Sequence, residues 1–188
     1  MIDGDRERLT LEPIAPAPQV GLLLAALEDS RRRTLRELEP VTDEMLAWQP
    51  SEPLSSIGQL LYHVALIEAD WLLSDILHLA EDEWPDWIGG EFPIDVRNDA
   101  GDLSRVPPEP VGRALARLAR VRAHLLEALN PMRDDDLHVA GRQPAYEVSP
   151  AWALHHLLQH EAEHRAHVTL ARDVFLTTAG GWQPSPAG

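Results

Sequence analysis

Residues 149–175 read SPAWALHHLLQHEAEHRAHVTLARDVF, and this stretch decides the fold. Its apolar residues recur at helical spacing, so that at about 100° per residue they fall within one stripe of a helix. Ser149 and Pro150 are favoured residues for the N-cap and for the first helical position. The stretch therefore predicts a long amphipathic helix.

Three further segments show the same periodicity: residues 18–38, residues 56 to about 78, and residues 110–129. Ser56 and Gln59 have the spacing of a capping box, in which the two residues satisfy each other's backbone groups at a helix start. No stretch shows the sustained apolar alternation with β-branched residues that marks a strand. The sequence predicts an all-α protein.

The length of 188 residues, with 44% hydrophobic residues, suits one domain that buries its own core. We expect this domain at residues 18–178, after an N-terminal extension at 1–17 and before a C-terminal tail at 179–188. Residues 81–109 show no regular pattern and are long for a connection. Three aromatic residues of this connection are expected to form a lid or an apolar pocket wall: Trp84, Trp87 and Phe92.

Charge and composition exclude several classes of partner. The net charge of -15 repels phosphate backbones and anionic lipid, so nucleic acid is not expected as a partner. The longest aliphatic run, residues 22–27, is far shorter than the roughly 20 residues of a membrane span. Because the first residues do not resemble a signal peptide, we expect a cytoplasmic protein. The lack of cysteine leaves His, Asp and Glu as candidate metal ligands.

Four histidines lie on the apolar stripe of the helix that begins at Pro150: His156, His160, His164 and His167. An unpaired polar group in such a position costs about 1–3 kcal/mol, so these imidazoles need partners. They could be core histidines that hydrogen-bond to carbonyl groups or to one another, but four on one stripe favour a divalent metal. His63, on the inner flank of the second long helix, is the expected third ligand beside His160 and His164. Three nitrogens would leave one position open for water or substrate.

Residues 160–164 also match H-E-x-x-H, in which the glutamate of a metalloprotease acts as a general base. The extended form of that motif requires Gly and His at the positions of His167 and Leu170, so it is not met. No glutamate follows Glu163 to serve as a third ligand. We expect Glu161 and Glu163 to face solvent, with Glu163 the more inward, and keep both as acid or base candidates.

Three further residues are candidates for supporting the site. His156 and His167 share the stripe with the expected ligands and could replace one of them or close a fourth position. Asp70 lies two helical turns beyond His63, and about 10 Å along the axis is too far to share one ion. We expect Asp70 to form a salt bridge or to hold a ligand in place.

Two segments together, SSIGQLLYH at 55–63 and HEAEHR at 160–165, resemble the DinB-like superfamily of metalloenzymes. The resemblance extends over about residues 18–178 and implies a four-helix bundle with long crossover loops. It also implies one divalent metal, zinc in the first place and nickel, iron or manganese as alternatives, on three ligands: His63, His160 and His164. The chain departs from the family at Ala166 and His167, where many members have a Gly-Gln pair.

Characterised relatives in this superfamily include thiol-dependent transferases and isomerases, maleylpyruvate isomerase among them. The resemblance implies a transferase that acts on a small-molecule substrate with a low-molecular-weight thiol such as mycothiol, bacillithiol or glutathione. Two alternatives stay open: a hydrolase that uses metal-activated water, and a non-enzymatic stress-response or interaction module with a structural metal. A homodimer is also expected, because helical bundles with spare apolar surface commonly pair.

Overall fold

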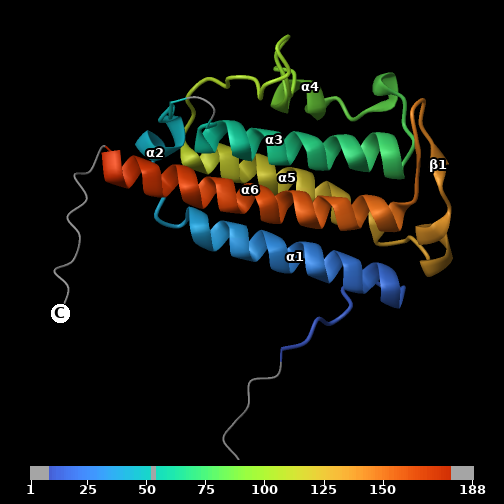
Figure 1. Cartoon of the computed structure of the whole chain (residues 1–188). Coiled ribbons are helices and arrows are strands. Elements are labelled where there is room, and N and C mark those ends of the chain that lie inside the picture. Colours follow the sequence, from blue (N-terminus) through green and yellow to red (C-terminus); the bar gives the residue numbers. More distant parts are fainter. Residues whose placement is uncertain (1–8, 52–53, 179–188) are drawn as a thin grey trace, which may run out of the picture.

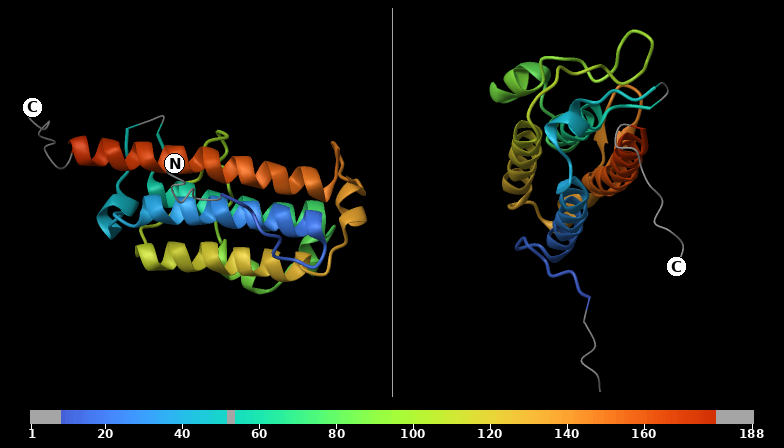
Figure 2. Two further views of the ribbon diagram at one scale, coloured as in Figure 1. Left: turned by 90° about the horizontal axis from the view of Figure 1, so that it is seen from below. Right: turned by 90° about the vertical axis from the view of Figure 1, so that its left-hand side faces the viewer.

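The computed structural model describes residues 9–51 and 54–178, and within them four long helices form one bundle (Figure 1). These helices are α1 (Pro18–Leu38), α3 (Ile57–Asp70), α5 (Val111–Leu129) and α6 (Pro150–Thr178). α1 packs against α6, and α3 packs against both α5 and α6. Seen end-on, the four helices stand at the corners of a square (Figure 2). The all-α prediction is confirmed, whereas the expected tail at 179–188 and residues 1–8 of the extension lie outside the described residues.

The helix starts follow the signals in the sequence. Gln59 donates its backbone N–H to the Ser56 hydroxyl at 3.1 Å, and its side-chain oxygen accepts from the Ser56 backbone at 2.9 Å, so the capping box is present. Ser149 likewise accepts from the backbone of Trp152 at 3.3 Å, with Pro150 as the first residue of α6. Past Asp70 the helix continues as a π-helical segment, η1 (Trp71–Ile76), which the sequence did not predict.

The connection between α3 and α5 is long because both helices point in the same direction, so the chain must return along the bundle (Figure 1). This connection is more regular than expected, since it holds a 3-10 turn, η2 (Glu81–Glu83), and a short helix, α4 (Trp87–Glu91). At one end of the bundle α2 (Asp43–Ala47) precedes α3. At the other end lie η3 (Asp134–His138) and a small antiparallel hairpin of β1 (Gly141–Arg142) and β2 (Glu147–Val148).

The core consists of two apolar clusters. One surrounds residues such as Leu61, Val64 and Leu118, and the other surrounds residues such as Leu24 and Leu125. Between the clusters lies a layer of four buried charged residues, one from each long helix: Arg31, Glu68, Arg122 and Glu161. This layer and the histidines described below occupy the middle of the bundle.

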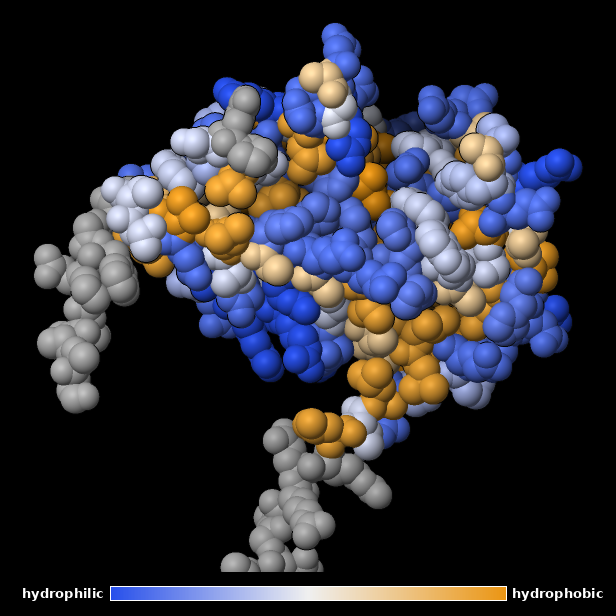
Figure 3. Space-filling view, in the orientation of Figure 1, coloured by the Kyte–Doolittle hydropathy of each residue, from blue (hydrophilic) through white to orange (hydrophobic). Residues whose placement is uncertain are grey.

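The molecular surface is mixed in character. On the face shown in Figure 3, hydrophilic side chains cover the middle, and apolar side chains gather near the start of α1. Leu11, Ile14 and Leu22 are among the exposed apolar residues of that region. No helix within the described part of the chain is both long and apolar enough to cross a membrane.

Candidate metal centre

Three histidines come together where α3 packs against α6. His63 on α3 is buried, and His160 and His164 lie one turn apart on α6 and are half-buried. One ring nitrogen from each lies within 4.8 Å of the others, and the Nε2 atoms of His63 and His160 are 2.9 Å apart. Bonds of about 2.0–2.1 Å to one zinc ion place two nitrogens about 3.4 Å apart, so the spacing suits a shared ion.

The electrostatics of the cluster favour neutral imidazoles. Burial, followed by the charge of neighbouring histidines, lowers the pKa of His160 to about 3. Burial is also the main reason why the pKa of His63 and that of His164 fall to about 4. Metal binding requires the unprotonated ring, and at neutral pH each of the three rings has one unprotonated nitrogen. Without a metal, one of these nitrogens accepts the hydrogen bond between His63 and His160. At neutral pH the three imidazoles are therefore in the unprotonated form that binds a metal cation.

The packing of the three imidazole rings supports the same interpretation. Nδ1 of His63, on the other side of the ring from the Nε2 that faces His160, is buried and has no hydrogen-bond partner among the described residues. The ring centroid of His63 lies 4.8 Å from that of His160 and 4.7 Å from that of His164, so the three rings pack against one another. Three adjacent neutral imidazoles cannot satisfy one another fully, whereas a divalent cation would use their lone pairs. The donor set fits such an ion.

The two other histidines of the stripe lie outside this group. His156 stacks on Trp152, with ring centroids 5.3 Å apart and planes 10° apart, and its ring lies 5.8 Å from that of His160. His167 is exposed, and its Nδ1 lies 3.4 Å from Nδ1 of His164. His167 is thus placed beside a ligand candidate, whereas His156 belongs to an aromatic stack at the hairpin end.

The expectation that Glu161 faces solvent is wrong. Its side chain is buried, and its two oxygens accept hydrogen bonds from Arg31 Nε at 2.7 Å and Arg122 Nη2 at 3.0 Å. With both oxygens held by guanidinium groups, a general-base role for Glu161 does not fit this geometry. Glu163 is exposed as expected, but the expectation that it is the more inward of the two glutamates is wrong. The charge of Glu163 opposes the lowering of the His164 pKa.

Glu161 belongs to the buried ion layer, which connects all four long helices. Arg31 also donates to Glu68 at 2.6 Å, and Arg122 donates to both oxygens of Glu68 at 2.7 and 2.9 Å. Burial alone would raise the pKa of Glu68, but the charges of Arg122 and Arg31 outweigh burial and lower it. Glu161 directly follows His160, so the layer fixes the rotation of α6 beside the metal centre. No motif in the sequence indicated these four residues as a group.

Other expected site residues lie elsewhere. Asp70 accepts from the hydroxyl of Ser74 at 3.3 Å and has no ion pair among the described residues, so the expected salt bridge is not formed. The aromatic residues of the long connection pack on the α3–α5 side instead of beside the three histidines of the candidate metal centre. Trp87 contacts His124 of α5, Phe92 contacts Tyr62, and Trp84 packs on the core cluster.

Two adjoining cavities lead to the metal centre from the α2 end of the bundle. One, of about 220 Å³, is lined by His164 and His167 together with Leu60. The other, of about 320 Å³, shares Leu54, Ser55 and Leu103 with the first cavity. None of the aromatic residues Trp84, Trp87 and Phe92 lines either cavity, so their role in a lid or pocket wall stays a prediction.

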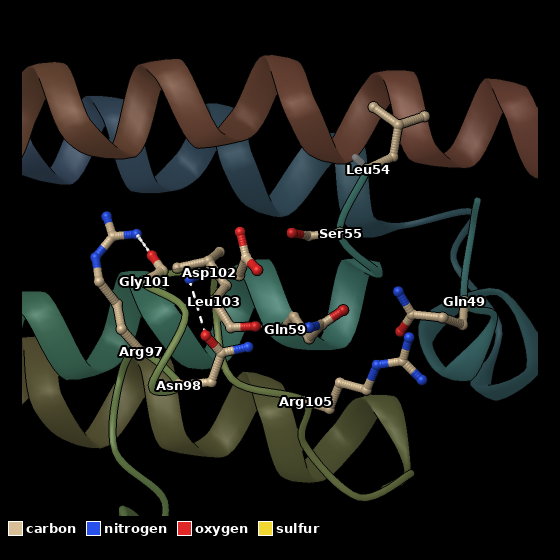
Figure 4. A pocket seen from close by; sticks show the side chains of 10 residues that line it. All are labelled: Gln49, Leu54, Ser55, Gln59, Arg97, Asn98, Gly101, Asp102, Leu103 and Arg105. Carbon is tan, nitrogen blue, oxygen red and sulfur yellow. Dashed lines mark hydrogen bonds between the residues drawn. The ribbon is translucent and has the colours of Figure 1, made fainter. Parts of the chain in front are cut away.

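The wall of the larger cavity comes from the second half of the long connection. Figure 4 shows Gln59 of α3 facing this segment, and its side-chain amide donates to the carbonyl oxygens of Leu103 and Ser104 at 3.2 and 3.3 Å. Arg97 lies at the same cavity and donates to the carbonyl of Gly101 at 2.6 Å. Its positive charge contributes to the lowered pKa of His63, which places the guanidinium within electrostatic reach of the cluster.

Comparison with known proteins agrees with this architecture. The sequence model of the DinB superfamily matches residues 26–168, and the chain belongs to this superfamily. A solved structure, that of a conserved protein from Enterococcus faecalis, is similar with a TM-score of 0.64 and 16% sequence identity. The alignment covers 84% of this chain and 96% of that one, and at this identity it supports the fold alone. No curated protein matches the chain at a significant level.

Proposed function

We propose that the chain is a metal-dependent transferase that acts with a low-molecular-weight thiol. The observation that carries this proposal is the group of three neutral histidine side chains whose ligand atoms lie within 4.8 Å of one another, beside two cavities. Three nitrogen ligands suit zinc, and they leave the fourth position for an incoming ligand. A bound divalent cation lowers the pKa of a thiol that enters this position.

Different residues of the chain bind the metal ion, admit the thiol and contact its carboxylate. His63, His160 and His164 hold the ion, and the cavity that His164 lines gives an incoming group access to the open position. Since the chain has no cysteine, the thiol has to come from a second molecule. The guanidinium of Arg97 offers a charge-assisted contact for a carboxylate, a group that glutathione carries. Leu54, Leu60 and Leu103 keep the approach apolar.

Calorimetric titration of the zinc-loaded protein with glutathione, bacillithiol and mycothiol tests the thiol part of the proposal. We expect one of these thiols to bind, and the heat of binding to vanish after chelation of the metal. The S-methylated form of the same thiol is the control, because it keeps the size and charge but cannot give a thiolate. Equal binding of the S-methylated form, or no binding of any thiol, would refute the transferase proposal and favour a hydrolase or a binding module.

The metal part of the proposal is separable from the thiol part. A closed fourth position would require another protein ligand, and neither His156 nor His167 belongs to the three-histidine group. The homodimer, the cytoplasmic location and the identity of the metal stay predictions.

A further inference from the structure

Three aromatic side chains gather at the hairpin end of the bundle, away from the two cavities at the metal centre. Trp71 begins η1, Tyr146 lies between β1 and β2, and Trp152 lies in the first turn of α6. The ring of Trp71 lies 5.4 Å from that of Trp152 and 6.4 Å from that of Tyr146, with planes 30° and 17° apart. Trp71 therefore stacks on both of the other rings.

These rings line a cavity of about 640 Å³, which we call the hairpin-end pocket. Its remaining wall comes from the η3–hairpin region and includes His138, Glu147 and Val148. A pocket of 300–1,000 Å³ with a mostly apolar wall is typical of a small-molecule site. Trp152 and Tyr146 are about half exposed, and exposed apolar side chains that gather in one patch often mark an interaction site or a ligand-binding groove.

The charges around the pocket are negative. Asp75 is only 3% exposed, its side chain accepts a hydrogen bond from Tyr146 at 3.0 Å, and it has no ion pair within the described residues. Asp70 is close by, since burial and then the charge of Asp75 raise its pKa. Glu147 lines the pocket itself and forms an exposed ion pair with Arg142 at 4.0 Å, so among the described residues Asp75 and Asp70 provide the unpaired negative charge. A buried carboxylate is usually paired with a positive charge, and around Asp75 the described residues provide none.

We propose that the hairpin-end pocket binds a small organic cation of the quaternary-ammonium class. Ring faces carry negative potential and attract such a cation, and the carboxylates add a field of the same sign. A primary ammonium would need hydrogen-bond acceptors directed at it, whereas a quaternary ammonium needs only ring faces and negative charge. The pocket supplies those two features.

This site is distinct from the metal centre, so the inference goes beyond the proposed transferase. Trp152 precedes His160 by eight residues, which is about 12 Å along α6. The ring of His156 lies between them, stacked on Trp152. The two sites can therefore be tested independently.

Choline is the probe for this inference, and 3,3-dimethylbutan-1-ol is its matched control, since it has the same shape without the charge. Binding is followed by calorimetry and by tryptophan fluorescence on the full chain. We expect choline to bind at least about tenfold more tightly than the neutral alcohol. Equal affinity for the two compounds, or no binding of either, would overturn the proposal.

Variants locate the binding site. Trp152→Leu keeps an apolar, half-exposed side chain but removes a ring, so choline affinity should fall about tenfold or more. Glu147→Gln should weaken choline binding severalfold, whereas Glu127→Gln, which removes an equal charge from the exposed side of α5, should not. His160→Ala should bind choline as the wild type does, even if it loses its metal. Unchanged choline affinity in Trp152→Leu would refute the location.

Discussion

Replacing Glu161 by glutamine should destabilise the protein strongly, although the change adds or removes no carbon atom. Glu161 and Glu68 balance the charges of Arg31 and Arg122 in a layer whose side chains are at most 6% exposed. Glutamine removes one of the two buried carboxylates that face Arg31 and Arg122, and it turns an NH₂ group toward guanidinium donors. Glu28 also pairs with Arg122 at 2.9 Å, but its side chain is 39% exposed, so it offsets only part of this loss. Breaking a buried ion pair by removing one partner costs about 3–5 kcal/mol.

The assay is urea and thermal unfolding of Glu161→Gln beside Glu163→Gln, the same substitution two residues further along α6. For a chain of this length the expected cost lowers Tm by about 6–20 °C. Glu163 is exposed, so its variant should stay within about 0.5 kcal/mol of the wild type. If the two variants unfold at the same urea concentration, the buried ion layer does not stabilise the bundle as we have argued.

Two further predictions concern the metal centre. In the metal-free protein the pKa values of His63 and His164 are about 4, and that of His160 is about 3. All three lie below the ordinary histidine pKa of 6.5. As the pH falls below 6.5, the unfolded chain therefore binds more protons than the folded one. The free energy of unfolding should therefore decrease from pH 6.5 to about pH 4, and less steeply in His160→Ala; a flat profile in urea unfolding series would contradict this. Arg97→Ala should weaken binding of a carboxylate-bearing thiol by about tenfold and leave the metal content unchanged. The control variant Arg142→Ala should alter neither thiol affinity nor metal content. If Arg97→Ala and the wild type bind the thiol with equal affinity in calorimetry, Arg97 does not contact the thiol.

Much of the fold followed from local signals. Helical periodicity, the Ser56–Gln59 capping box and the Ser149–Pro150 helix start are properties of neighbouring residues, and the structure has helices at all of these positions. His160 and His164 were identifiable as a pair because residues four apart share a helix face. A spacing of 97 residues carries no geometric information by itself, so the association of His63 with them was expected from its place on the inner flank of the second long helix and from the family resemblance.

The errors concern contacts between distant segments. Glu161 is next to the apolar stripe of α6. Because α6 packs against both α1 and α3, more of the surface of this helix is buried than the apolar stripe indicates. A carboxylate can be buried there only because Arg122 and Arg31 reach it from helices 39 and 130 residues away. Aromatic residues such as Trp84, Trp87 and Phe92 often line pockets. Tertiary packing, however, determines which side of the bundle the long connection covers.

Metal analysis of His160→Ala tests whether the three histidines bind a metal ion, with His155→Ala, which changes an exposed histidine of the same helix, as the matched control. Both variants and the wild type are loaded with zinc, desalted and analysed by mass spectrometry of the metal. We expect about one zinc ion per chain for the wild type and His155→Ala, and less than about a tenth of that for His160→Ala. Unchanged zinc content in His160→Ala would contradict the three-histidine centre.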